Sequence, residues 1–147
     1  MQHIILIKIV KFFKIKIQNT VHWRIDMELD IRLKILMDAG QISEETFETL
    51  KKVIGMFKNK WSILLTEDNG AMLITHLSVA IERIKKGEEI KGIDSEIYSQ
   101  IKNHCEFAKC RQVLKDIVYE AEINIPEYEE TFIMMHLCTL FESNRVN

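Results

Sequence analysis

The sequence predicts an all-α protein, folded as a compact bundle of five or six helices. Almost half of its 147 residues are hydrophobic, yet it contains only one proline and five glycines, so signals for turns are few. From residue 28 onward, apolar residues recur at spacings of three and four, which is the period of a helix with one buried face. The length suits one domain with a real core and is short for two.

We expect one helical domain over residues 27–147, preceded by an N-terminal extension over residues 1–26. The apolar stretch of that extension, residues 4–17, is interrupted by four lysines, and no small-residue cleavage site follows it. It therefore fits neither a signal peptide nor a membrane-spanning helix, and we expect no membrane association. Three interpretations stay open: the extension is disordered, it forms a strand that pairs with the edge of a sheet, or the native protein starts at Met27.

The charge distribution argues against nucleic acid as a direct partner. The chain has a net charge of −2, but residues 1–26 carry five basic residues and one acidic residue, which leaves a net charge of −6 on residues 27–147. Binding to a phosphate backbone needs a basic surface, and such binding would rest on the extension alone.

The three cysteines, Cys105, Cys110 and Cys138, lie within helical patterns and lack any C-x-x-C spacing. Their odd number argues against a complete set of disulfides, and free cysteine often acts as a small buried apolar residue. The sequence therefore predicts three reduced thiols in a cytoplasmic protein, with no metal site and no cofactor.

The first two helices follow from apolar spacing and capping residues. One begins at Glu28 and ends at Gly40, a residue type that favours the conformation found just after a helix. Another begins after Ser43, a residue type that caps helix N-termini, and ends near Trp61. Their inner faces are predicted to consist of Leu29, Leu33 and Leu36 in the first helix, and Phe47, Leu50, Ile54 and Phe57 in the second.

Three more helical segments follow. The sequence Asp68-Asn69-Gly70 is typical of a turn and predicts a helix over about residues 69–86. The next helical region covers about residues 94–121, with a break near His104. The last helix is expected over about residues 126–142, because proline is favoured in a first turn and acidic residues follow it there.

Two histidines interrupt these apolar patterns. At 100° per residue, His76 lies at the rim of the buried face, and Arg83 lies two turns further along, so the spacing does not imply a direct contact between them. On the last helix, Glu129 and His136 share a face with apolar residues, so both need partners across the helix packing. We therefore expect a partner protein to reach His76 more readily than His136.

Each histidine belongs to a motif, and the two motifs lie 60 residues apart. The first reads His-Leu/Ile-x-x-Ala-Ile-x-Arg and is matched by His76, Leu77, Ala80, Ile81 and Arg83, followed by Gly87. The second reads Leu/Ile-Pro-x-x-Glu-x-x-Phe/Tyr-Ile-x-x-His and is matched by Ile125, Pro126, Glu129, Phe132, Ile133 and His136. Together they resemble the two histidine motifs of the PTS regulation domain, or PRD, of bacterial sugar-responsive transcription regulators.

The resemblance covers roughly residues 43–143 and implies a single PRD. It implies that His76 and His136 accept phosphoryl groups from HPr or from enzyme II components of the phosphotransferase system, with Arg83 and Glu129 as supporting residues. Such a domain is a regulator and not an enzyme: phosphorylation changes a homodimer and thereby the transcription of a sugar-related operon. The chain departs from the pattern at Thr75, where the family usually has an acidic residue.

Other functions stay open beside this one. The main alternative is a non-phosphorylated helical interaction module that dimerises with a full-length regulator. A metal-assisted hydrolase using His76, His136 and Glu129 is less favoured, because the chain has no H-x-x-x-H or H-E-x-x-H motif. We therefore predict no catalytic residue and no metal ligand.

Overall fold

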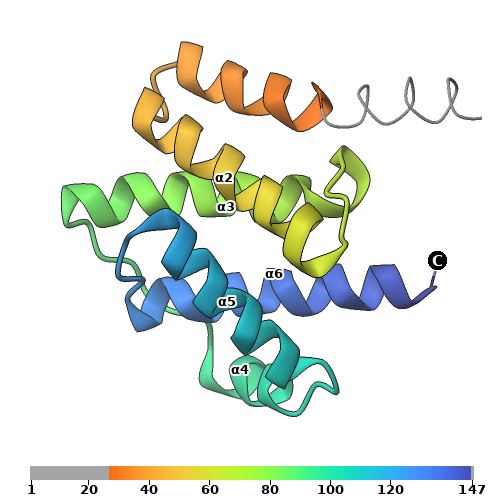
Figure 1. Cartoon of the computed structure of the whole chain (residues 1–147). Helices are drawn as coiled ribbons and strands as arrows, with labels where there is room; N and C mark the ends of the chain where they lie inside the picture. Colours follow the sequence, from red (N-terminus) through yellow and green to blue (C-terminus); the bar gives the residue numbers. More distant parts are fainter. Residues whose placement is uncertain (1–26, 147) are drawn as a thin grey trace, which may run out of the picture.

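The computed structural model describes residues 27–146, and within this range it contains six helices and no strand (Figure 1). Residues 27–38 form the first of these, called the leading helix here. The others are α2 (Glu44–Trp61), α3 (Glu67–Lys86), α4 (Ser95–Lys102), α5 (Phe107–Ala121) and α6 (Glu127–Val146). The all-α prediction is confirmed, whereas the interpretations of residues 1–26 lie outside the described residues.

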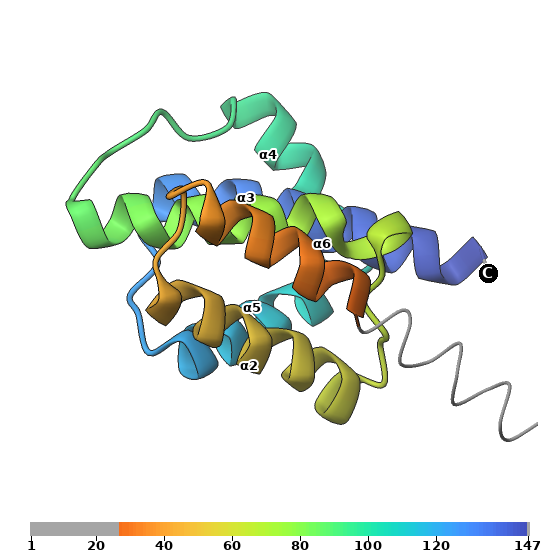
Figure 2. The same ribbon diagram turned by 90° about the horizontal axis from the view of Figure 1, so that it is seen from above.

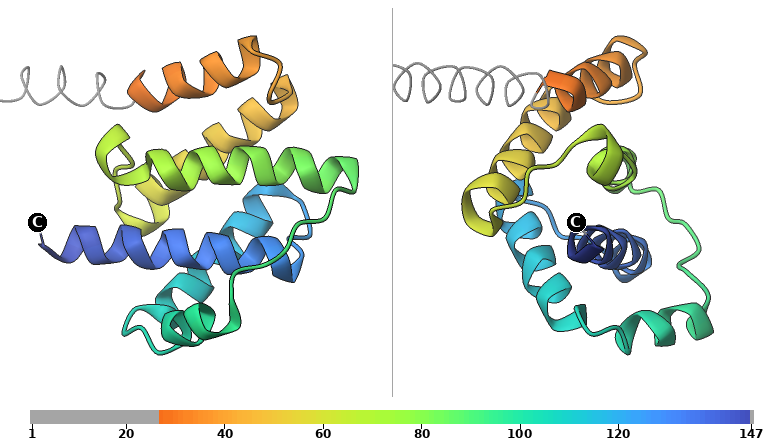
Figure 3. Two further views of the ribbon diagram at one scale, coloured as in Figure 1. Left: turned by 180° about the vertical axis from the view of Figure 1, so that it is seen from behind. Right: turned by 90° about the vertical axis from the view of Figure 1, so that its right-hand side faces the viewer.

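The bundle is built from two antiparallel helix pairs that cross each other (Figures 1 and 2). One pair is α3 with α6 and the other is α2 with α5, and α5 also packs against α6. Seen end-on, α6 lies in the middle, with α3, α5 and α4 around it (Figure 3). The core between the pairs is apolar, and its largest fully buried side chains include Leu50, Phe57, Leu73, Leu77, Ile117, Ile133 and Met134.

The start of α3 differs from the prediction, because α3 begins at Glu67 and not at residue 69. Thr66 caps the helix: its hydroxyl accepts from the backbone N–H of Asn69, and the Asn69 side chain accepts from the backbone N–H of Thr66. This reciprocal capping box satisfies two N–H groups that a helix start leaves unpaired. The residues that resemble a turn therefore form the first helical turn.

Most of the other predicted boundaries agree with the structure. Ser43 is the N-cap of α2, and the predicted break near His104 is confirmed between α4 and α5. Gly40 has a positive φ of 71° just after the leading helix, as a helix-terminating glycine does. At the C-terminal end, α6 continues to Val146, past the expected end at Glu142.

Among residues 27–146, no helix combines the length and apolar character that crossing a membrane requires.

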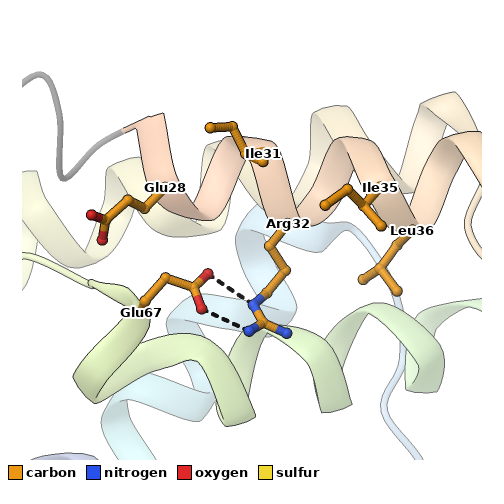
Figure 4. Close-up of a pocket in the computed structure, with 6 residues that line it drawn as sticks. All are labelled: Glu28, Ile31, Arg32, Ile35, Leu36 and Glu67. Carbon is orange, nitrogen blue, oxygen red and sulfur yellow. Dashed lines mark hydrogen bonds and ion pairs between the residues drawn. The ribbon is translucent and has the colours of Figure 1, made fainter.

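Polar bonds join the leading helix to α3, and its residues Leu29 and Leu33 are buried in the apolar core. The guanidinium of Arg32 donates two hydrogen bonds to the Glu67 carboxylate, from Nε at 2.8 Å and from Nη2 at 2.6 Å (Figure 4). Its third nitrogen, Nη1, donates to the Thr75 hydroxyl at 3.2 Å. Arg32 therefore links the leading helix to the first three turns of α3.

A partly apolar groove lies beside this contact (Figure 4). Its walls include Ile31 and Ile35, which are 50% and 62% exposed. Neither His76 nor His136 lines the groove. The groove is therefore a feature separate from the two histidines.

Candidate functional site

The antiparallel pairing of α3 and α6 brings the two motif histidines together. The ring centroids of His76 and His136 lie 5.2 Å apart, with their planes inclined by 42°. The Phe132 ring, one turn before His136 on α6, lies 5.4 Å from the His76 ring. Residues 60 positions apart in the chain thus form one imidazole pair at the α3–α6 interface.

The two predicted supporting residues also meet at this interface. Arg83 of α3 donates from Nε to Glu129 Oε1 at 2.7 Å and from Nη2 to Glu129 Oε2 at 3.0 Å. Glu129 is completely buried, and such a two-bond pair is the form in which a buried carboxylate is best satisfied. These hydrogen bonds raise the pKa of Arg83. The prediction that Glu129 has a partner across the helix packing is confirmed.

His76 also approaches the same carboxylate but does not form a hydrogen bond with it. Its Nε2 atom lies 3.4 Å from Glu129 Oε2 and is the one buried side-chain nitrogen or oxygen without a hydrogen-bond partner among the described residues. An unpaired buried polar atom is costly and requires an explanation in a native structure. The Glu129 carboxylate therefore has two neighbours: it accepts two hydrogen bonds from Arg83, and its Oε2 atom lies near His76 Nε2.

The surroundings favour the neutral form of both imidazoles. Burial is the main cause that lowers the pKa of His76; the positive charge of Arg83 acts in the same direction, and the Glu129 carboxylate opposes both. Burial, followed by the neighbouring His76, lowers the pKa of His136. Each ring therefore keeps a nitrogen lone pair near neutral pH, which is the state in which histidine acts as a nucleophile.

The expected difference in accessibility between the two histidines is wrong. The sequence periodicity predicts that His76 lies at the rim and that His136 lies deeper in an apolar stripe. In the structure both residues are partly buried. The reason is that the antiparallel pairing of α3 and α6 brings the two rings next to each other, so that both lie in similar surroundings. The periodicity of one helix cannot show which edge its neighbour leaves uncovered.

One contact near the site could not be predicted from the sequence. Thr75, the residue before His76, accepts a hydrogen bond from Arg32 of the leading helix. Arg32 has no place in either motif, because the leading helix precedes the part of the chain that matches them. This bond ties the leading helix to the turn of α3 that carries His76.

The arrangement is unfavourable for a metal ion. His76, His136 and Glu129 are neighbours, but both carboxylate oxygens of Glu129 are bound by a guanidinium, whose positive charge opposes a cation at the same place. Within residues 27–146 no group of three or more histidine, cysteine or acidic side chains has an arrangement that could hold a metal ion.

Acid should weaken the fold through the two histidines. Their pKa values are lowered in the folded protein relative to the ordinary value of about 6.5, so the unfolded chain binds more protons just below that pH. The stability they contribute is fully present above about pH 6.5 and is lost as the pH falls through the lowered pKa values. Urea unfolding at several pH values should show that the H76Q/H136Q variant loses less stability than the wild type between pH 7.5 and 5.5. Equal losses would contradict this.

Comparison with known proteins agrees with the motifs. The PRD domain family profile matches residues 51–139, which include both histidines, Arg83 and Glu129. The chain is 22% identical over 113 residues to a protein of Escherichia coli K12 described as "Uncharacterized protein YhfY", covering 77% of this chain and 94% of that protein. No solved structure matches it significantly. The match to the family covers more than half of the chain, and the chain therefore belongs to the PRD domain family, of which it contains a single domain.

Proposed function

We propose that this chain is a regulatory domain of the phosphotransferase-system type, in which His76 and His136 accept phosphoryl groups from HPr or an enzyme II component. Membership of the PRD domain family supports the general class of function. The observation that carries the proposal is the pair of partly buried imidazoles, 5.2 Å apart, whose surroundings favour the neutral form.

The chemistry asks little of the domain itself. A neutral imidazole nitrogen attacks the phosphorus of a phosphorylated donor histidine; a new N–P bond forms, the donor N–P bond breaks, and its electron pair returns to the donor nitrogen. His76 Nε2 lies 3.4 Å from Glu129 Oε2, and we propose that this nitrogen carries the proton, so that the lone pair on Nδ1 makes the attack. The domain is thus the acceptor in a transfer that the donor protein completes, and it needs no catalytic residue of its own.

The new charge supplies the signal. A phosphohistidine brings close to two negative charges and strong acceptor oxygens next to the buried Glu129 carboxylate. Arg83 is partly exposed, with 21% of its side chain accessible, and we expect it to turn from Glu129 towards the phosphoryl group. Such an exchange changes the packing of α3 on α6, and in a homodimer this change reaches the control of a sugar-related operon.

The test is a transfer assay with the full chain, enzyme I, HPr and labelled phosphoenolpyruvate. We expect label that is stable in alkali and lost in acid, and we expect the H76Q/H136Q variant to lose it. The H104Q variant is the matched control, because His104 pairs with Glu142, outside the α3–α6 histidine pair. Absence of label from the wild type with every HPr and enzyme II donor would overturn the proposal.

The alternative is a non-phosphorylated interaction module that dimerises with a full-length regulator. It is favoured by large apolar side chains that are exposed in the monomer, namely Ile31 and Ile35 on the leading helix and Met72 on α3. Scattered exposed apolar residues are common, but a helix that presents two of them one turn apart offers a surface for another helix. This alternative predicts no label in the transfer assay and co-purification with a longer PRD protein.

A further inference from the structure

Two of the three cysteines meet in the core, where α5 packs against α6. Cys110 of α5 is fully buried and Cys138 of α6 is 6% exposed, and their sulfur atoms lie 3.6 Å apart. The third, Cys105, is exposed. The sequence predicted three separate thiols, since no spacing rule links residues 28 positions apart on different helices.

The separation is short enough for a covalent bond after a small movement. A disulfide needs its sulfurs about 2.05 Å apart, so these two must approach by roughly 1.5 Å. The helices α5 and α6 already pack directly on each other. A rotation of the two side chains, with a slight shift of one helix, supplies a movement of this size.

We propose that Cys110 and Cys138 form an oxidisable pair, which a peroxide converts reversibly into a disulfide between α5 and α6. The Cys138 sulfur attacks one peroxide oxygen; the O–O bond breaks, and a sulfenic acid and one water form. The Cys110 sulfur then attacks the sulfenic sulfur, the S–O bond breaks and a second water leaves. Two thiols are oxidised and one peroxide is reduced to two waters.

The surroundings agree with this order of attack. The hydrogen bond between the two thiols, followed by the charge of His104, lowers the pKa of Cys138, against the effect of burial. The same hydrogen bond, followed by burial, raises the pKa of Cys110. The thiolate is the reactive form, so Cys138, which is also the more exposed of the two, is the sulfur that meets the oxidant.

The bond would hold the helix that carries half of the candidate site. Cys138 lies two residues after His136, on the same helix as Glu129. A link to α5 fixes α6 against the second helix pair of the bundle. The proposal itself does not depend on phosphorylation of the histidines.

The test uses the full chain, treated with hydrogen peroxide, then denatured, alkylated with N-ethylmaleimide, digested and analysed by mass spectrometry. We expect a peptide pair joined through Cys110 and Cys138 that has lost two hydrogen atoms, and that separates on reduction. The C105S variant should give the same pair, and the C138S variant should not.

Three results would overturn the proposal. They are free Cys110 and Cys138 under conditions that oxidise the exposed Cys105, a disulfide of any other connectivity, and Cys138 oxidised beyond sulfenic acid without a disulfide. Because the decisive measurement is made on the wild type and C105S, it does not depend on the folding of a variant with an altered core.

Discussion

Replacing Glu129 with alanine should lower the free energy of unfolding by about 3 to 5 kcal/mol. Glu129 is completely buried, and its two oxygens accept both hydrogen bonds from Arg83. The substitution removes those bonds and leaves a guanidinium without its partner inside the α3–α6 interface. Because the Arg83 side chain is 21% exposed, water takes up part of the lost interaction, and we expect the lower end of this range. Urea unfolding at pH 7.5 measures the change.

The matched control is Glu127→Ala, an acidic residue on the same helix that is exposed. Its loss should change the free energy of unfolding by no more than about 1 kcal/mol, which is the size of an interaction with the helix dipole. A cost below about 1 kcal/mol for Glu129→Ala as well would show that the Arg83–Glu129 pair does not stabilise the interface.

A second phosphoryl group should enter the domain roughly a hundredfold less favourably than the first. The His76 and His136 rings are 5.2 Å apart, so two phosphoryl groups on them would be close neighbours. Two unit charges about 5 Å apart repel by about 0.8 kcal/mol in water, and nearly two charges on each group multiply this by about four. The resulting penalty of about 3 kcal/mol corresponds to the stated factor.

Intact-mass spectrometry at alkaline pH, with increasing amounts of phosphorylated HPr, measures this occupancy. We expect the singly phosphorylated wild type to dominate well beyond the point where the first group saturates. The single variants H76Q and H136Q are the controls, and each should accept one group. A second group that enters the wild type as readily as the first would contradict the proximity of the two histidines during transfer.

Much of the fold could be predicted, because the local spacing of apolar residues and the capping residues indicate where helices lie and where they end. Ser43 and Gly40 marked helix ends from their residue types alone, and the structure places them there. The start of α3 could not be read in the same way, because Asn69 is a turn residue and also a capping-box partner. Only the reciprocal bonds with Thr66 distinguish these roles.

The candidate site, too, could be predicted only in part from the sequence. The two motifs identified His76, His136, Arg83 and Glu129, and the structure brings all four together. The similar burial of the two histidines and the contact between Cys110 and Cys138 depend on how neighbouring helices are rotated against each other. A hydrophobic period sets the buried face of one helix but not the residue that faces it from the next.

The central claim is that the two histidines of the α3–α6 interface receive the phosphoryl group. The most direct measurement is transfer from phosphorylated HPr or an enzyme II component to the wild-type chain, followed by digestion at alkaline pH and fragmentation that keeps the N–P bond. We predict phosphoryl groups on the peptides that contain His76 or His136. Phosphorylation confined to His3, His22 or His104, or no phosphorylated peptide from any of these donors, would contradict the account.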